Sequence, residues 1–433
     1  MKKCLVLLGM TMLVIAAFGQ TYNAELENKA KTGDAEAQCD LGICYDEGRG
    51  INRNQKKAFY WYNKSAEQGS ARGQVQLGVC YEKGRGVTQD YAKAFYWYSK
   101  AAEQGQPIGI NNMAVCYATG IGVPKDEVKA FELYYLAAKK GYATGQNNLG
   151  FCYFEGKGTG VDYPKAVYWF GKAAEQGNPM AQCNLAVCYE NGKGVARDLA
   201  KAFSLYQQAA FKGYKKATDW FAEMAEKGKA DAQNTLGVLY NDGIGLKKNP
   251  AKAFYWYTKA AEQGHPVGQF NMGGAYLHGD GTQKDVSKAI YWYTKAAEQG
   301  YLDAYKVLGY LYSGAEGVEH DYEKAAYWYA KAADKGSLEC NLALGRIYYD
   351  NKYGLMDYGK AVHYLNIARE SPDAYVSGAA CFLLSKCYRN GRGVPKDKEK
   401  ADSLQDEASK KGYDEAMSIE QLTEKLNKIY SNK

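Results

Sequence analysis

The chain has 433 residues, of which 46% are hydrophobic and 24% are charged, which is enough for a large folded core. Its 55 basic and 48 acidic residues give a formal net charge of +7, and the two signs are interspersed along the sequence. This pattern argues against a dedicated nucleic-acid-binding protein, which should carry a basic stripe or tail. Tyrosine is unusually frequent, with 40 residues.

Residues 1–19 are typical of an export signal. Two lysines precede an apolar run from Leu5 to Phe18. Small residues at Ala17 and Gly19 favour cleavage after Gly19. A buried first helix is the alternative. The run is shorter than the ~20 residues of a membrane helix, so we expect no stable membrane insertion after cleavage. The sequence predicts an exported protein, periplasmic or secreted.

Downstream of this segment the sequence repeats itself at a step of 36 residues. Two copies read KAFYWYSKAAEQG from Lys93 and KAFYWYTKAAEQG from Lys252. The copies begin at Lys57, Lys93, Lys129, Lys165, Lys201, Lys252, Lys288, Lys324, Lys360 and Lys400. The step between Lys201 and Lys252 is 51 residues, so one insertion interrupts the array. Such periodicity is the signature of a stacked repeat fold.

Each copy should fold as two helices joined by a short loop. In the fifth copy Ala181, Leu185 and Tyr189 follow one another at intervals of four residues, which predicts one apolar face of the first helix. In the sixth copy the second helix should bury Trp256 and Tyr257. An Asp or Asn three residues before each Lys can accept from backbone amides of the first turn of that helix. These residues are Asn54, Asp90, Asp126, Asp162, Asp198, Asn249, Asp285, Asp321, Asp357 and Asp397.

A Gly-x-Gly pair follows the first helix of most copies, as in YENGKGV at residues 189–195. A similar Gly-Lys-Gly occurs in phosphate-binding loops, but those loops need a preceding strand and a helix N-terminus directed at the ligand. Here each pair follows a helix, and the chain has no G-x-x-x-x-G-K-[ST]. We therefore interpret the glycines as turn residues that supply positive φ.

The combined pattern, AxxxLGxxYxxGxGVxxDYxKAxxWYxKAAEQG, resembles that of Sel1-like repeats, relatives of the tetratricopeptide repeats. The resemblance extends over ten units. It implies an all-α fold, a right-handed α-solenoid of helix-turn-helix Sel1-like repeats, with the first helix of each unit on the concave side. It also implies an adaptor or scaffold that works through protein–protein contact. We expect a monomer.

The sequence predicts four segments after the signal. They are repeats one to five at 34–213, an extra helix at 214–228, repeats six to ten at 229–412, and a polar capping helix at 413–433. In the extra helix Phe221, Met224 and Ala225 form an apolar stripe. An unmatched helix should change the rotation between units, which predicts two stacks that meet at an angle, with Trp220 at the joint. A surface excursion from one continuous stack is the alternative.

Six of the seven tryptophans share one position of the second helix, and Leu or Tyr fills that position elsewhere. We interpret it as a packing position; stacking on bases or sugars is the alternative. Six of the ten cysteines downstream of the signal share a position that Leu, Ala or Ile fills in other repeats, as expected of the core. Neighbouring helices lie ~8–10 Å apart, whereas a disulfide needs Cα atoms within ~7 Å. We therefore expect free thiols, with Cys39 and Cys183 reacting first from the concave face.

No constellation typical of catalysis stands out. The four histidines, His265, His278, His320 and His363, lack paired-ligand spacing. Some Sel1-like proteins have been linked to β-lactam binding, but the chain has no S-x-x-K for serine acylation. We expect no metal, no cofactor and no enzymatic activity.

The candidate binding residues lie on the first helices. With Leu41 directed to the core, a row of positions at ~100° per residue points away from it. Amides and rings in this row suit an extended peptide, because Asn can bond to its backbone and the rings provide anchors. The candidates are Asn112, Asn148, Asn184, Asn271, Phe151, Phe154, Phe270 and Tyr310. Alternatively, the amides satisfy neighbouring carbonyls and the rings pack between repeats.

The sequence therefore predicts a non-enzymatic exported scaffold that binds a protein or peptide along its concave surface. The alternative is a cell-envelope protein that binds carbohydrate or peptidoglycan, or that regulates an enzyme. We expect no nucleic acid partner.

Overall fold

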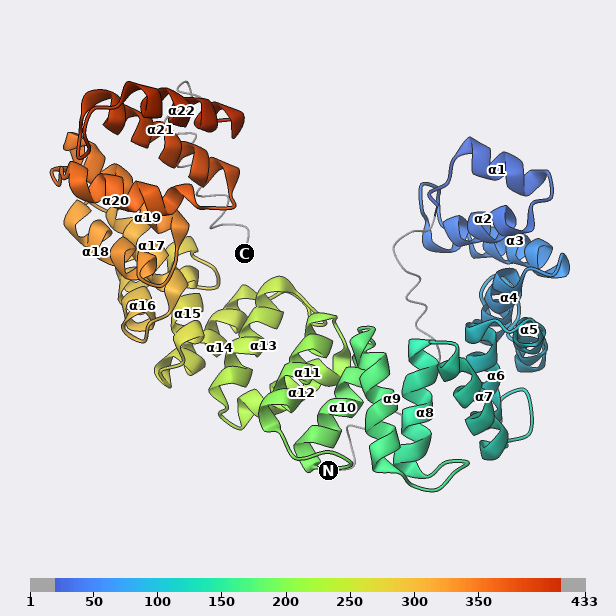
Figure 1. Cartoon of the computed structure of the whole chain (residues 1–433). Helices are drawn as coiled ribbons and strands as arrows, with labels where there is room; N and C mark the ends of the chain where they lie inside the picture. Colours follow the sequence, from blue (N-terminus) through green and yellow to red (C-terminus); the bar gives the residue numbers. More distant parts are fainter. Residues whose placement is uncertain (1–19, 414–433) are drawn as a thin grey trace. The chain divides into compact units, whose positions relative to one another are not determined.

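The computed structural model describes residues 20–413, and every regular element in that range is a helix (Figure 1). The predicted signal at 1–19 and the predicted capping helix, apart from Tyr413, lie outside the described residues. Backbone contacts divide the chain into two compact parts. The first part comprises Met1–Trp220 with Ile244–Leu246, and the second comprises Phe221–Gly243 with Lys247–Lys433.

Each repeat is a pair of packed helices, which we call helix A and helix B, as Figure 1 shows for both parts. Helices A are α2 (Ala35–Glu47), α4 (Ala71–Lys83), α6 (Pro107–Thr119), α8 (Ala143–Glu155), α10 (Pro179–Asn191), α13 (Ala230–Asp242), α15 (Pro266–His278), α17 (Leu302–Tyr312), α19 (Leu338–Tyr349) and α21 (Ala374–Asn390). Helices B are α3 (Gln55–Glu67), α5 (Tyr91–Glu103), α7 (Glu127–Lys139), α9 (Tyr163–Glu175), α11 (Leu199–Phe211), α14 (Pro250–Glu262), α16 (Val286–Glu298), α18 (Tyr322–Ala333), α20 (Tyr358–Arg369) and α22 (Lys398–Lys410). The predicted α-solenoid of two-helix repeats is confirmed.

Helices B begin where the Asp/Asn pattern predicts. In all ten repeats the side-chain oxygen of the predicted cap accepts from the backbone N–H of the Lys three residues later. In the second repeat this bond joins Lys93 N to Asp90 Oδ1 at 2.9 Å. Each such bond satisfies one backbone donor that the first turn leaves unpaired.

The two glycines of the Gly-x-Gly pair have different tasks. Gly84 ends α4 in the left-handed region, with φ at 67°, and donates its N–H to the carbonyl oxygen of Cys80. Gly86 also has positive φ, and a Cβ there would collide with the carbonyl oxygen of Gln55 at the start of the preceding helix B. The pair thus caps one helix and lets the loop lie against the previous helix B, which explains the motif without a phosphate.

In six of the ten repeats an aromatic ring of helix B lies on a glycine of helix A, and in repeat nine Leu365 takes the place of the ring on Gly345. Tyr98 is fully buried, and a Cβ on Gly78 would lie 2.6 Å from its ring. Tyr62 on Gly42 and Phe170 on Gly150 repeat the arrangement. Burying such a ring contributes roughly 1.5–3 kcal/mol, so glycine here serves close helix packing.

Glutamines tie successive helices together in a regular pattern. Gln74 in α4 donates to the carbonyl oxygen of Ala66 in the preceding α3, at 3.5 Å. Its own Oε1 accepts from Gln104, which follows α5, at 2.8 Å. One side chain on helix A therefore joins the helices B before and after it. The same Gln–Gln bond joins Gln38 to Gln68, Gln146 to Gln176, Gln233 to Gln263 and Gln269 to Gln299.

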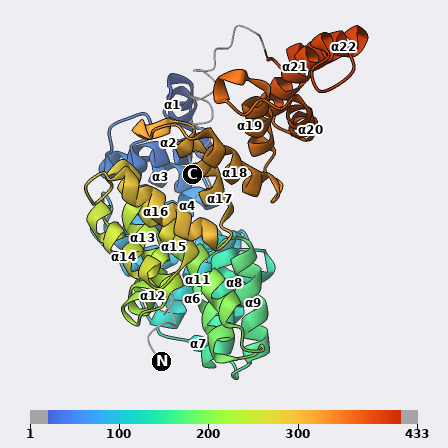
Figure 2. The same ribbon diagram turned by 90° about the vertical axis from the view of Figure 1, so that its left-hand side faces the viewer.

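Helices A of consecutive repeats also pack on one another. Such pairs include α2 with α4, α13 with α15 and α19 with α21. Consecutive helices B have no comparable backbone contact within residues 20–413. Helices A are therefore the more closely spaced row within each part, which makes theirs the concave side. Figure 2, after a quarter turn, shows α8 beside α9 and α21 beside α22.

The insertion contains one helix, α12 (Lys215–Glu226). Its sequence, KKATDWFAEMAEKG at 215–228, aligns with KKAFYWYNKSAEQG of the first helix B at 56–69. The buried residues correspond as well, because Ala217, Phe221 and Ala225 take the places of Ala58, Tyr62 and Ala66. The Ala225 carbonyl oxygen accepts from Gln233 at 3.1 Å, as Ala66 accepts from Gln74. The inserted helix thus resembles an additional helix B. Its Trp220 ring stacks on the Tyr206 ring of α11, and the two ring centroids are 4.2 Å apart.

Three local features differ from the repeat pattern. Helix α1 (Ala24–Lys31) precedes the first repeat and packs on α2, which the sequence analysis did not anticipate. The 3₁₀ turns η1 (Ala315–Gly317) and η2 (Asn351–Tyr353) replace the Gly-x-Gly loop in repeats eight and nine. Helix α21 has 17 residues and so accommodates the extra length of repeat ten.

Candidate functional site

The structure places all eight candidate residues on helices A. Six lie on α6, α8 and α15, and the others are Asn184 on α10 and Tyr310 on α17. Five are buried: Asn112, Asn148, Asn184, Phe151 and Phe154. Three are half-buried: Phe270, Asn271 and Tyr310. The buried five belong to the first part of the chain and the half-buried three to the second.

Hydrogen bonds connect asparagines of α6, α8 and α10 into a directional ladder. Asn184 donates to Asn147 at 2.9 Å, and Asn148 donates to Asn111 at 3.0 Å, each bond reaching the preceding helix A. Within one helix, Asn147 donates to Asn148 and Asn111 to Asn112, both at 3.3 Å. These asparagine side chains thus hydrogen-bond to one another within and between repeats. Contact of these amides with a partner stays a prediction.

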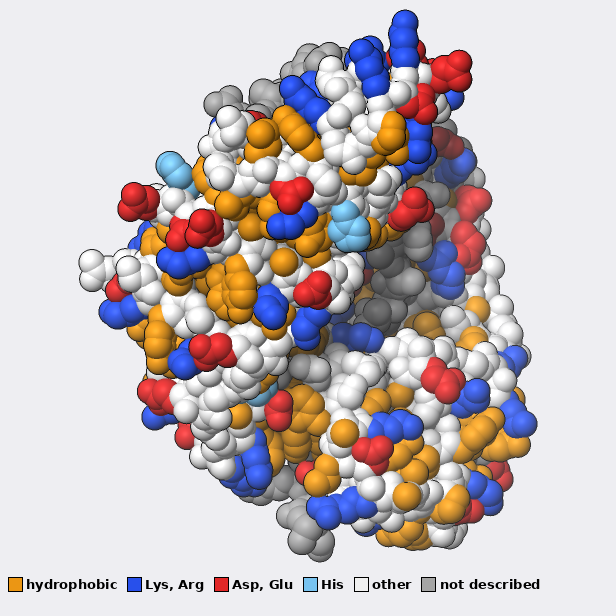
Figure 3. Space-filling view, turned by 60° about the vertical axis from the view of Figure 1, so that its left-hand side comes forward, with side chains coloured by type: hydrophobic (Ala, Val, Ile, Leu, Met, Phe, Trp, Pro, Cys, Tyr) orange, Lys and Arg blue, Asp and Glu red, His pale blue; other side chains and the backbone are white. Residues whose placement is uncertain are grey.

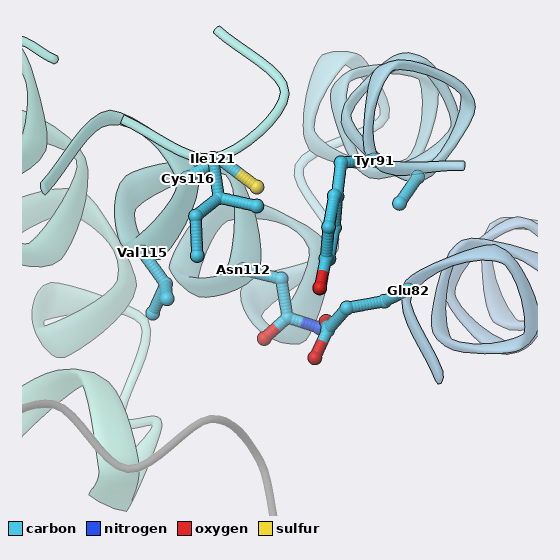
Figure 4. Close-up of a pocket in the computed structure, with 7 residues that line it drawn as sticks. Glu82, Tyr91, Asn112, Val115, Cys116 and Ile121 are labelled. Atoms are coloured by element: carbon cyan, nitrogen blue, oxygen red, sulfur yellow. The ribbon is translucent and has the colours of Figure 1, made fainter. Parts of the chain in front are cut away.

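The ladder ends at Asn112, whose Nδ2 has no hydrogen-bond partner among the described residues. The preceding helix A carries Val75 at the position where the ladder would continue. The Asn112 amide points instead toward Glu82, across a cavity of about 10 Å³ (Figure 4). Glu82 accepts from Tyr98 Oη at 2.6 Å and lies 2.7 Å from Lys83 Nζ. Although the lining of this cavity is mainly apolar, its volume suits one water molecule between the Asn112 amide and the Glu82 carboxylate.

In the second part the row is more accessible. The Phe270 ring packs on Tyr293 and Tyr301, with ring centroids 5.2 and 5.1 Å away, and is half-buried. Its neighbour Asn271 donates to Asn234 of α13 at 2.8 Å. Both residues are therefore fixed in position while part of each side chain stays open to solvent, which suits a preformed binding surface.

Sequence reasoning did not single out Lys306, which occupies the same row in α17. Its ammonium lies 3.8 Å from Asp303 and 3.9 Å from Glu339 of the next helix A. A step of 36 residues from Phe270 leads to Lys306, so the periodicity alone could have found it. The row thus combines a ring, an amide and a cation on neighbouring helices.

All ten cysteines in the described residues are buried. Burial raises the pKa of Cys80, Cys116 and Cys152 to about 12, so these thiols stay protonated at neutral pH. The expectation that Cys39 and Cys183 are accessible on the concave face is wrong: they are 0% and 2% exposed. Neighbouring helices A pack over this side of the helix, which a helical wheel does not show.

Within residues 20–413, no group of three or more His, Cys, Asp or Glu side chains is arranged to hold a metal ion. No helix in that range has the length and apolar character to cross a membrane.

A protein-family model matches each of the ten repeats described above. The family model described as Sel1 repeat matches residues 35–70, 71–106, 107–142, 143–178, 179–214, 230–265, 266–301, 302–337, 338–373 and 378–401. A search of curated proteins found no match.

Three solved structures are similar to this chain in sequence over half of its length or more. A protective antigen present in uropathogenic Escherichia coli strains, displaying an SLR fold, is 33% identical, covers 94% of both chains and has a TM-score of 0.42. A Sel1 repeat protein from Oxalobacter formigenes is 33% identical, covers 75% of this chain and 90% of its own, and has a TM-score of 0.33. An immunity protein from Pseudomonas aeruginosa is 23% identical, covers 54% of this chain and 81% of its own, and has a TM-score of 0.28.

Proposed function

Because the chain belongs to the Sel1 repeat family, whose members generally mediate protein–protein interaction, we propose that it is an exported, non-enzymatic scaffold that binds a protein or an extended peptide along its helix A side. Membership of the family supports a general role in protein–protein interaction. The helix A surface, export and the absence of catalysis are the finer parts of the proposal.

The half-buried row on α15 and α17 supports the choice of surface. Phe270 and Tyr310 offer rings that can anchor a partner side chain, and Asn271 offers an amide that can bond to a peptide backbone. These side chains sit on packed helices rather than loops, so little ordering is required on binding. Lys306 adds a hydrogen-bond donor to the row, and its charge is balanced by Asp303 and Glu339.

Site-specific photocrosslinking tests the surface. A photoreactive phenylalanine analogue replaces Tyr310 in one variant and Tyr135, on the exposed face of the helix B α7, in a matched control. We expect the Tyr310 variant to give one defined protein adduct in envelope extract and the Tyr135 variant to lack that adduct. Identical adducts from both positions, or no adduct from Tyr310, would refute binding on the helix A side.

Export makes a separate prediction. The sequence up to Gly19 carries the signal pattern, so the exported protein should begin at Gln20. Intact-mass measurement of the exported fraction decides the question. A chain that retains Met1 to Gly19 would contradict cleavage.

A further inference from the structure

Six repeats carry an aromatic and basic cluster on helix B, which we call the outer triad. It consists of Tyr, Trp and Lys at three, four and seven residues after the first Lys of the copy. The triads are Tyr60–Trp61–Lys64, Tyr96–Trp97–Lys100, Tyr168–Trp169–Lys172, Tyr255–Trp256–Lys259, Tyr291–Trp292–Lys295 and Tyr327–Trp328–Lys331. The last three occupy consecutive repeats on α14, α16 and α18.

The three consecutive triads have nearly identical geometry. Their tyrosines, Tyr255, Tyr291 and Tyr327, are 51%, 53% and 54% exposed. Each tyrosine ring meets the ring of the following tryptophan edge to face, with centroids 4.9, 5.1 and 4.9 Å apart. The lysine ammonium groups lie 5.8, 5.9 and 5.6 Å from the tyrosine centroids. Each triad therefore presents a braced aromatic surface with a cation beside it.

The fold does not require the triad. In the other four repeats the three positions are occupied by Glu132, Leu133 and Leu136; Ser204, Leu205 and Gln208; His363, Tyr364 and Ile367; and Ser403, Leu404 and Glu407. These repeats form the same two-helix pair, yet none of them keeps the tyrosine, the tryptophan or the lysine. Among the ten repeats the three residues thus occur together or not at all. The tryptophan also packs against the core, as Trp256, Trp292 and Trp328 do, so the exposed tyrosine and the lysine are the members that packing does not explain.

The charges around the triads limit what they can bind. An acidic residue follows each triad lysine by three positions: Glu262, Glu298 and Asp334 in the second part. Lys295 lies 3.1 Å from Glu298. Figure 3 likewise shows hydrophobic side chains interspersed with both basic and acidic ones on one face of the molecule. Nucleic acids and anionic membranes attract uncompensated cations, so a balanced row does not suit them.

We propose that the outer triads of α14, α16 and α18 form a binding row for a neutral linear polysaccharide. The C–H face of a pyranose ring is apolar and slightly positive, so it complements the negative face of an aromatic ring. The lysine donates and the nearby carboxylate accepts, which matches the two hydrogen-bonding roles of sugar hydroxyls. Three equivalent sites at a regular step suit a ligand that also repeats, and together they bind more tightly than one site alone.

The row lies on helix B, so this inference does not depend on partner binding by helix A.

The direct test is calorimetric titration of the full mature chain with hydroxyethyl cellulose and cellohexaose, at 0.15 M and 0.5 M salt. We expect wild-type protein to bind, and to bind equally at both salt concentrations, because the contacts are not ionic in origin. The Tyr255→Ser, Tyr291→Ser, Tyr327→Ser variant should bind the polymer at least about tenfold more weakly.

Serine is chosen because Ser204 and Ser403 occupy this position in folded repeats. The matched control, Val128→Ser, Val161→Ser, Met356→Ser, removes three exposed apolar side chains outside the triads and should bind as wild type. A triple Tyr→Phe variant, which keeps the rings, should also bind. The proposal is overturned if wild type binds neither sugar, if the serine variant binds unchanged, or if 0.5 M salt abolishes binding. Binding of single-stranded RNA or anionic vesicles through the same tyrosines would overturn it as well.

Discussion

Single side chains fix the stacking of this fold through reciprocal polar contacts. An asparagine amide can donate and accept at once, so Asn148 accepts from Asn147 of its own helix and donates to Asn111 of the previous one. With 1% of its surface exposed, Asn148 has no water to replace these partners. Buried amides therefore favour one pairing of successive helices over shifted ones.

This arrangement predicts a large difference between two similar substitutions. Asn148→Ala leaves buried groups of Asn111 and Asn147 without a partner, so the free energy of unfolding should fall by about 2–4 kcal/mol. Asn271→Ala removes one bond at a half-buried site that water can reach, and should cost about 1 kcal/mol. Urea unfolding followed by circular dichroism compares the two midpoints. Equal shifts of the urea midpoint in the two variants would contradict a stabilising role of the buried asparagine ladder.

The buried thiols make stability depend on pH in the alkaline range. Burial raises the pKa of Cys116 to about 12, whereas the unfolded thiol titrates near 9. The unfolded chain thus loses its proton first, so the contribution of the thiol is intact below pH 9 and declines as the pH rises toward 12. We expect urea midpoints to fall between pH 8 and pH 10.5. The fall should be smaller in a Cys80→Ala, Cys116→Ala, Cys152→Ala variant.

Alkylation gives an independent measurement of the same thiols. Iodoacetamide at pH 8 should modify the native protein slowly and the urea-unfolded protein completely, because the thiolate is the reacting form. Peptide mapping that found Cys39 modified rapidly in the native state would contradict its burial.

At the scale of helices, periodicity predicted most of what the structure contains. The Asp/Asn caps, the glycine after most helices A and the apolar stripes act within a few residues, so the sequence specifies them locally. The burial of Asn112 and Asn184 depends on how closely neighbouring helices A approach, which no single helix determines. Helix α1 was missed because it carries no copy of the repeat pattern.

The second glycine of the Gly-x-Gly loop should be among the least replaceable residues of a repeat. Gly158 has φ at 67°, and a Cβ there would collide with the carbonyl oxygen of Glu127. Gly158→Ala should therefore lower the free energy of unfolding by more than about 2 kcal/mol. Gly160 has no positive φ and no atom within 4 Å of an added Cβ, so Gly160→Ala should be neutral or slightly stabilising. Similar thermal midpoints for both variants would refute the close approach.

At the scale of the whole molecule, the inserted helix is the main irregularity. Deleting 214–228 joins Gly213 to Lys229 and restores the step of 36 residues. Ala210 would then take the place of Ala225 as acceptor for Gln233, so we expect the deletion variant to fold. If the insertion changes the rotation between stacks, X-ray scattering should show a more uniformly curved particle after deletion. Mass-corrected profiles that superimpose would favour a surface excursion instead.

The glutamine bonds described above have a mechanical consequence. Gln74 and Gln104 are 30 residues apart in sequence, and the Asn bonds between helices A span 37. Because each of these bonds reaches no further than an adjacent repeat, the junctions between repeats carry a tension applied to the two chain ends in series, and the weakest junction opens first. A stretched chain should lengthen in steps, each releasing one or a few repeats, with roughly 120 Å of extended polypeptide per repeat. The repeats that remain would keep their own bonds and so could still hold a ligand under load.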